Sequence, residues 1–451
     1  MEAVRHPLDS RAAVESATRA LALLAGAAAI ALFFAAAAAA LSRYPLPLTV
    51  VLAAGLGLLL TLALALARYD AAVAFGILLL AAVRLEPAPA DLVFAVVIAV
   101  AVVTGRLHLQ RVPLAVTMLV GAFLALNLVA SFEVIDPARA VTYLGITLYL
   151  GVFGLWLAAY VDSRRRARLV LAAFVIAAVA SALAASLALF VHFPGSAVLV
   201  DGPRAKGLFK DPNVFGPFLV PAALFLLEEA AFPRLLRWRL ATKLAFLSVV
   251  TVGIVFSFSR AAWLNLAVGA LVMILVLALR RRGRRRALAV LAALLSACAI
   301  LFAVVAVTSS LTFIQERAGL QAYDTQRFGA QASGVDFALE YPLGVGPGQF
   351  ERVSDISAHS TYVRAMAEEG FLGLFIVLAL LLLTLVFALR NAFAGRDTYG
   401  IGSAALLAAW CGLLANSIFV DTLHWRHLWF VAALIWAGTA WRAARPLRFR
   451  A

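Results

Sequence analysis

The chain has 451 residues, of which 65% are hydrophobic and only 14% are charged, and its mean hydropathy is +1.00. A soluble domain of this size needs far more polar surface, so the composition excludes a water-soluble globular protein. The net charge of +15 suggests nucleic acid as a partner, but most arginines lie in short segments between apolar runs, where they indicate membrane topology instead. We therefore expect no nucleic-acid partner.

Repeated apolar runs of about 20 residues, each long enough to cross a hydrocarbon core of roughly 30 Å, predict an all-α polytopic integral membrane protein. Residues 1–451 are expected to form a single transmembrane bundle. In chain order the predicted spans are 18–40, 46–67, 69–84, 90–104, 113–131, 141–161, 168–192, 214–232, 241–258, 262–279, 287–309, 366–389, 399–420 and 424–441. Two neighbouring runs are short enough to form one broken element, so we expect about 12–14 transmembrane helices.

Basic residues alternate between the two sides of the predicted bundle. They gather on one side, at Arg106 and Arg111, at 164–168, at 234–243, at 280–286, at Arg390 and Arg396, and in the C-terminal tail. By the positive-inside rule this side is cytoplasmic, and both termini lie there. The segments on the other side are extracytoplasmic, and two of them are long: 193–213 and 310–365, the second with short helices.

The segment 193–213 is basic although it lies on the outer side. It contains RAKGLFKDPN, with Arg204, Lys206, Lys210 and Asn213. One explanation is a solvated loop that contacts lipid headgroups. The alternative is an anionic substrate, because the arginine fork binds two phosphate oxygens at once.

Two further outer segments carry arginines. The short turn FSFSRAAWL contains Arg260, which is either an interfacial anchor or a second anion ligand. The long segment adds Arg317 and Arg327, followed by EYPLGVGPGQF at 340–350. These glycines do not indicate a dinucleotide site, because no strand precedes them, and we interpret them as turn residues.

A lone histidine, His359, lies directly before an apolar run in ISAHSTYVRAMAEEGFLG, which also holds Tyr362, Arg364 and Glu368. Ionisable groups at a membrane boundary are candidates for function, although a histidine before a helix is often a capping residue. A histidine of ordinary pKa takes a proton from a hydroxyl near neutral pH. Together with arginines from several segments, it suggests displacement of a phosphorylated leaving group by an alcohol.

The sequence gives little support for metal chemistry. There is no H-E-x-x-H motif, and the acidic residues of the outer segments are scattered. Because several cations neutralise a diphosphate without a metal ion, we expect no metal and no cofactor. The HWRH motif at 424–427 is interpreted as an interfacial anchor.

In these segments the chain resembles the O-antigen ligase family, bacterial membrane glycosyltransferases that share a fold with O-antigen polymerases. The resemblance covers roughly residues 200–420. It is carried by RAKGLFKDPNVFG at 204–216, SFSRAAWLNLAVG at 257–269, RFGAQASGVDFALEYPLGVGPGQF at 327–350 and HSTYVRAMAEEGFLG at 359–373. It implies an inverting, metal-independent ligase of the bacterial inner membrane, with its active site facing the periplasm.

The resemblance also implies substrates and roles. The donor is O-antigen on undecaprenyl pyrophosphate, and the acceptor is a sugar hydroxyl of lipid A–core, in lipopolysaccharide biosynthesis. His359 matches the family's functional histidine and is expected to act as general base, while Arg204 and Arg260 match its arginines. Binding of diphosphate or glycan is expected of Lys206, Lys210, Asn213, Arg317, Arg327, Tyr362 and Arg364, and positioning of an arginine is expected of Glu368.

Other functions remain open. An O-antigen polymerase and a protein O-oligosaccharyltransferase use the same donor and differ in the acceptor. The chain ends shortly after the last predicted span, which favours a glycolipid acceptor. From another class, a lipid-linked glycan transporter is the alternative, but the sequence has no internal repeat and few ionisable residues in the middle of its spans.

Overall fold

The computed structural model describes residues 48–443, apart from 133, 281–284, 286–287, 294, 297–298, 300–321 and 355–356. The predicted span 18–40, most of the span 287–309, Arg317 and the basic C-terminal tail lie outside the described residues.

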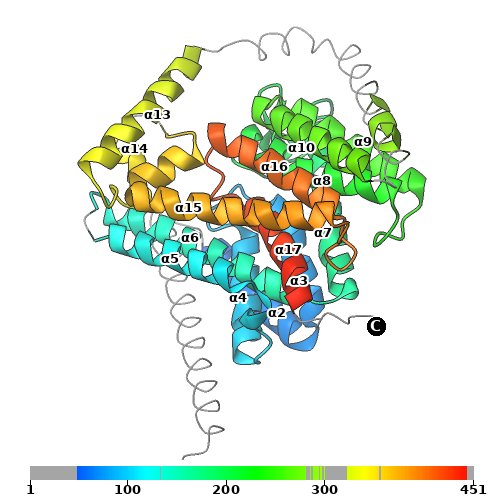
Figure 1. Cartoon of the computed structure of the whole chain (residues 1–451), viewed down its shortest axis with the longest axis horizontal. Coiled ribbons are helices and arrows are strands. Elements are labelled where there is room, and N and C mark those ends of the chain that lie inside the picture. Colours follow the sequence, from blue (N-terminus) through cyan, green and yellow to red (C-terminus); the bar gives the residue numbers. More distant parts are fainter. Residues whose placement is uncertain are drawn as a thin grey trace, which may run out of the picture.

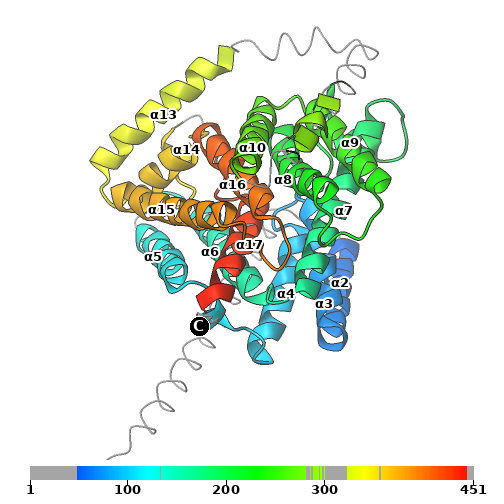
Figure 2. The same cartoon turned by 45° about the vertical axis from the view of Figure 1, so that its right-hand side comes forward.

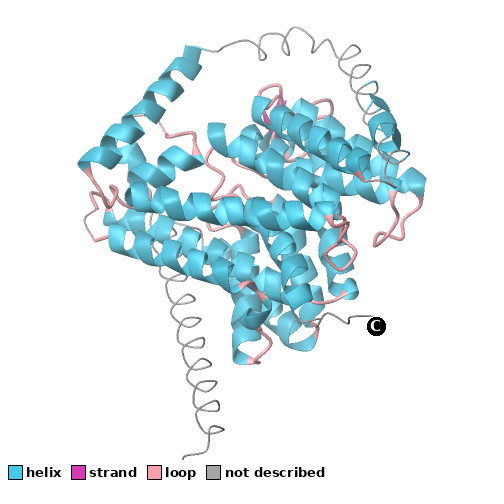
Figure 3. Cartoon of the chain, in the orientation of Figure 1, coloured by secondary structure: helices cyan, strands magenta, loops and turns pink. Residues whose placement is uncertain are grey.

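Helices form most of the described chain (Figures 1 and 3). They are α2 Leu48–Ala67, α3 Tyr69–Leu78, α4 Pro89–Val103, α5 Leu114–Ala130, α6 Pro137–Tyr160, α7 Arg164–Ala188, α8 Pro212–Ala231, α9 Leu240–Phe256, α10 Arg260–Leu279, α13 Ala322–Glu340, α14 Phe350–Val353, α15 Thr361–Phe393, α16 Ser403–Phe419 and α17 Arg426–Ala443. The short elements are η1 Leu79–Ala81, η2 Leu109–Arg111, η3 Ser196–Leu199 and the strands β1 Val200–Asp201 and β2 Arg204–Ala205.

Five of the described helices are long and apolar enough to cross a membrane, namely α6, α7, α8, α10 and α15. Six shorter apolar helices of 10–17 residues accompany them. Large apolar side chains such as Leu271 of α10 and Phe375 of α15, each 68% exposed, cover the outward-facing surfaces of the helices, as lipid contact requires. The structure is therefore that of an all-α membrane protein, while the count of 12–14 spans stays a prediction.

Several helices begin at side chains that cap them. Asp136, Ser163, Asp211, Ser259 and Ser360 each accept a hydrogen bond from a backbone N–H in the first turn of the helix that follows. Such caps satisfy N–H groups that have no partner within the helix. The last two caps fix the starts of α10 and α15.

The segments predicted to be basic and cytoplasmic meet at one end of the bundle. Arg164 donates to the carbonyl oxygen of Arg234 at 2.5 Å, and Arg234 pairs with Asp397 at 2.8 Å. Arg280 donates to the hydroxyl of Ser403 at 3.0 Å. These contacts join the ends of α7, α8, α10 and α16 at one end of the molecule, while the membrane orientation stays a prediction.

The two long segments that were predicted to be extracytoplasmic contain more regular structure than short helices alone. In 193–213, β1 and β2 form an antiparallel hairpin that pairs Val200 with Ala205 and Asp201 with Arg204. In 310–365, α13 has 19 residues, and Figures 1 and 2 show it lying obliquely beside α14 and the start of α15. The second segment thus contains a long helix where only short ones were expected.

Candidate active site

Helix α15 is broken at Gly370, whose φ of 70° and ψ of −172° are not helical. The break leaves backbone carbonyls without partners inside the helix. The carbonyl oxygens of Ala367 and Glu368 instead accept hydrogen bonds from Val345 and Gly346, each at 2.9 Å. The loop before α14 therefore completes the broken helix, which is how irregular backbone is tolerated inside a membrane protein.

The glycines of this loop make its tight path possible. Gly344, Gly346 and Gly348 have φ angles of 81°, 95° and 71°. A Cβ on Gly344 would lie 2.2 Å from the carbonyl group of Glu368, so the loop approaches α15 more closely than any other residue allows. Their interpretation as turn residues is confirmed.

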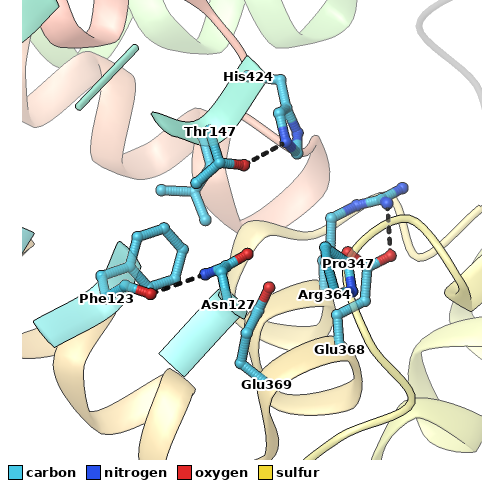
Figure 4. Close-up of a pocket in the computed structure, with 9 residues that line it drawn as sticks. Phe123, Asn127, Thr147, Pro347, Arg364, Glu368, Glu369 and His424 are labelled. Atoms are coloured by element: carbon cyan, nitrogen blue, oxygen red, sulfur yellow. Dashed lines mark hydrogen bonds and ion pairs between the residues drawn. The ribbon is translucent and has the colours of Figure 1, made fainter. Parts of the chain in front are cut away.

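Arg364 lies at the centre of a buried ion-pair network and is 4% exposed. Its Nη1 donates to Glu368 Oε1 at 2.8 Å, its Nη2 pairs with Glu351, and its Nε lies 3.1 Å from Asp421 Oδ2. Figure 4 shows the pair of Arg364 and Glu368. Carboxylates surround its guanidinium group, and the binding of diphosphate or glycan by Arg364 stays a prediction.

Glu368 and Glu351 connect this network to the loop. Glu368 Oε2 accepts from the backbone N–H of Gly348 at 2.9 Å, and its Oε1 accepts from that of Phe350 at 3.3 Å. Glu351 accepts from Arg139 Nη2 of α6 at 2.7 Å. The network thus fixes three elements relative to one another: α6, the loop with α14, and α15.

Asp421 and His424 extend the network from the turn before α17. His424 Nδ1 lies 2.8 Å from Asp421 Oδ2, and His424 Nε2 lies 3.3 Å from the hydroxyl of Thr147. Burial alone would raise the pKa of Asp421, but His424 and Arg364 lower this pKa to about 2. Burial acts to lower the pKa of His424, and the carboxylate of Asp421 outweighs it and raises this pKa above 6.5. The two side chains form a charged pair at mildly acidic pH.

The interpretation of HWRH at 424–427 as an interfacial anchor is wrong. Arg426 and His427 are only 5% and 2% exposed. Arg426 forms a two-pronged ion pair with Asp91, in which Nε lies 2.6 Å from Oδ1. The motif is buried because α17 packs against α6, α15 and α16 instead of facing the headgroups.

His359 immediately precedes α15 and has a positive φ of 45°. Its carbonyl oxygen accepts a hydrogen bond from Gln331 Nε2 of α13 at 3.3 Å. The next residue, Ser360, caps α15, and its hydroxyl lies 3.5 Å from the carbonyl oxygen of Ser417 at the end of α16. Contacts from two other helices thus hold the backbone that carries the histidine, whose side chain is partly exposed.

Arg204 and Arg260 lie on adjoining elements. Arg204 Nε donates to the carbonyl oxygen of Ser257 at 3.0 Å, and its Nη2 donates to Asn213 Oδ1 at 3.0 Å. Ser257 belongs to the turn that leads into Arg260, the first residue of α10. Helix α10 packs along α16, and the carbonyl oxygen of Ser417, near the C-terminal end of α16, lies close to Ser360. The three predicted catalytic residues, Arg204, Arg260 and His359, therefore lie at the same end of the bundle.

The remaining residues that were predicted to bind the diphosphate or the glycan are more scattered. Lys206 is partly exposed, and Lys210 pairs with Glu86 at 2.6 Å near the surface. The hydroxyl of Tyr362 donates to the carbonyl oxygen of Leu414 of α16 at 3.4 Å. Arg327 is part of α13, and Arg317 lies outside the described residues.

A narrow cavity adjoins the buried network (Figure 4). It is lined by Phe123, Asn127, Thr147, Pro347, Arg364, Glu368, Glu369, Leu423 and His424. Glu369 is 4% exposed, and within the described part of the chain its carboxyl group makes no hydrogen bond or ion pair. Glu369 was not predicted from the sequence, although two successive acids before a glycine in an apolar run are unusual enough to mark it.

Arg139, Glu351 and Asp421 were also missed, because each lies far from Arg364 in the sequence or in a turn with no motif. Across the described residues, no three His, Cys, Asp or Glu side chains are grouped to hold a metal ion. Metal independence stays a prediction.

Comparison with known families adds one match. A family described as O-antigen ligase matches residues 244–378, and this match supports an O-antigen ligase family member. The matched region includes Arg260, His359 and Glu368 but not the hairpin with Arg204. A search of curated proteins finds no match to the chain.

Proposed function

From this partial family match, we propose that the protein is an inverting, metal-independent ligase of the bacterial inner membrane. It transfers O-antigen polysaccharide from undecaprenyl pyrophosphate to a sugar hydroxyl of lipid A–core, with its active site at the periplasmic face. The observation that carries the proposal is the family match over residues 244–378, which contains His359 before α15 and Arg260 at the start of α10.

His359 is the proposed general base. It takes the proton of the acceptor hydroxyl while the hydroxyl oxygen attacks C1 of the donor sugar from the face opposite the diphosphate. The C1–O bond to the diphosphate breaks in the same step, so the configuration at C1 inverts. Proton removal by a positioned base contributes typically about 10²–10⁴-fold in rate.

Arg204 and Arg260 are the proposed ligands of the leaving diphosphate, whose negative charge grows as the C1–O bond breaks. Two features of their placement support this role. Asn213 and the carbonyl oxygen of Ser257 orient Arg204, and Arg260 begins α10, where unpaired N–H groups and the helix dipole favour anions. Lys206, Lys210, Arg317, Arg327 and Tyr362 remain candidates for further contacts to the glycan or the diphosphate.

Arg364 and Glu368 are proposed as positioning residues. Their buried network holds the start of α15 against α6 and the loop before α14. Charged groups that are already paired and buried are poor substrate ligands, because rearranging them leaves a carboxylate unpaired. They act through the placement of His359.

The test is transfer by the purified protein in EDTA, with undecaprenyl-pyrophosphate-linked glycan and lipid A–core as substrates. We expect product from wild type, none from His359→Ala, and normal turnover from His192→Ala, an exposed histidine after α7. Circular dichroism and thermal unfolding confirm that both variants are folded.

Other outcomes separate the alternatives. Near-normal turnover by His359→Ala removes the base assignment, and loss of product in EDTA removes metal independence. Lengthening of the donor glycan with lipid A–core untouched assigns the protein as a polymerase. No product with any acceptor, including a protein, favours the lipid-linked glycan transporter.

A further inference from the structure

A second polar hollow lies at the other end of the bundle from the candidate active site. Helix α6 connects the two, with Arg139 in the active-site network and Tyr160 at its far end. Its 24 residues span about 36 Å, enough to cross a hydrocarbon core. The far hollow is lined by Tyr69, Arg106, Leu107, Trp156, Ala159, Tyr160 and Arg166.

Aromatic rings hold two guanidinium groups beside this hollow. The guanidinium carbon of Arg106 lies 5.1 Å from the ring centre of Tyr69, and that of Arg166 lies 4.7 Å from the ring centre of Tyr160. The two rings are 6.0 Å apart. Trp156 Nε1 donates to the hydroxyl of Tyr69 at 3.0 Å, which fixes the wall between them. Both cations are therefore placed along one rigid aromatic surface.

The charges around the hollow do not balance. Asp162 pairs with Arg111 at 2.5 Å and with Arg166 at 2.8 Å. Asp70 pairs with Arg165 and lies 3.6 Å from Arg166. Both carboxylates are thus already engaged.

Arg106 is exposed and forms no ion pair with any carboxylate in the described parts of the chain. Four arginines against two carboxylates leave an excess of positive charge, and the arginine fork suits the oxygens of a phosphate group. Positive-inside bias explains why arginines occur at this end but not why two of them line one aromatic hollow.

We propose that this hollow binds the phosphodiester of an anionic phospholipid in the leaflet opposite the active site. Arg106 and Arg166 contact the phosphate oxygens, and the buried rings of Tyr69, Trp156 and Tyr160 form the rigid wall behind the two guanidinium groups. The lipid joins α3, α6, α7 and the turn after α4, and its binding stabilises the folded protein. The proposal does not depend on the proposed transfer reaction.

The experiment measures lipid binding by the purified, detergent-solubilised full chain. Phosphatidylglycerol, phosphatidylcholine and inorganic phosphate are added separately, and bound lipid is counted by native mass spectrometry alongside the shift in melting temperature. We expect phosphatidylglycerol to bind and stabilise wild type, with Arg106→Gln weakening its binding about tenfold, the usual effect of losing a charge-assisted hydrogen bond. The matched control is Arg237→Gln, an exposed arginine at the same end but outside the hollow, which binds as wild type does.

Three results overturn the proposal. Equal loss in Arg106→Gln and Arg237→Gln means general surface attraction, and equal effects of phosphatidylcholine mean that the anion is not recognised. Full stabilisation by inorganic phosphate means that the site holds a free anion and not a lipid. A second variant, Arg106→Lys, keeps the positive charge but lacks the forked guanidinium group. It must bind phosphatidylglycerol more weakly than wild type, and this comparison tests the site even if Arg106→Gln folds poorly.

Discussion

Glu368 and Glu369 are neighbours in the sequence, yet their surroundings are opposite. Glu368 accepts hydrogen bonds from Arg364 and from two backbone N–H groups. Glu369 faces the cavity, where Glu368 lies as a like charge and the described residues supply its carboxyl group with no hydrogen-bond or ion-pair partner. A buried carboxyl group without a partner costs free energy.

We expect Glu368→Gln to lower the free energy of unfolding by about 1–3 kcal/mol, because it removes a charged acceptor from a buried network. Glu369→Gln should leave stability unchanged or raise it, since the amide needs no counter-charge. Thermal unfolding of the two isosteric variants in the same detergent makes the comparison. Equal destabilisation by both would show that Glu369 has a partner in the folded protein.

The pair of His424 and Asp421 predicts how stability depends on pH. The raised pKa of His424 stabilises the folded protein fully below the ordinary value of 6.5, and this contribution is lost as pH rises through the folded-state pKa. The lowered pKa of Asp421 also stabilises the folded protein. This stabilisation is complete above the ordinary pKa of 3.8 and is lost as pH falls toward about 2. The pair therefore contributes most between about pH 4 and 6.5.

The measurement is the melting temperature of wild type and His424→Gln from pH 5 to 9. We expect the advantage of wild type to shrink as pH rises, because His424 loses its proton. Curves that stay parallel over this range would contradict the assignment of the charged pair. Contributions that are common to both proteins cancel in the difference.

At the scale of whole elements, α13 is placed to control His359. Gly334 of α13 faces Val363 of α15 so closely that a Cβ would lie 2.3 Å from Val363 Cγ1. Three residues earlier, Gln331 donates to the carbonyl oxygen of His359. Close packing at the glycine therefore sets the distance of the hydrogen bond.

Gly334→Ala should separate α13 from α15 and slow glycan transfer several-fold without unfolding the bundle. Gly329→Ala on the same helix is the control, because a Cβ there meets nothing within 4 Å. Initial rates of product formation for the two variants test this role of α13. Equal rates would mean that α13 does not influence the histidine.

At the scale of the molecule, the two ends of the bundle are predicted to face different compartments. Lys206 and Arg237 are at least partly exposed at opposite ends. In a background with Cys298 and Cys411 replaced by Ala, Lys206→Cys should react with a membrane-impermeant thiol reagent in intact spheroplasts. Arg237→Cys should react only after the membrane is opened. The reverse pattern would place the candidate active site in the cytoplasm and remove the proposed periplasmic reaction.

Local sequence patterns determined most of the architecture. Runs of apolar residues, capping residues such as Ser259 and Ser360, and the glycines before α14 each act over a few positions, so the helices start and end close to where they were predicted. The alternation of basic segments likewise anticipated which helix ends meet. Hydropathy and backbone conformation are properties of a residue and its near neighbours, and one sequence is enough to recognise them.

Only the tertiary structure decided which charges are free to act. Around Arg364, Glu351 approaches from α14 and Asp421 from the turn before α17. Arg426 and His427, interpreted as surface anchors, are buried by the packing of α17. Pairing of charges depends on distances set by helix packing between segments far apart in the chain, and no spacing within one sequence encodes those distances.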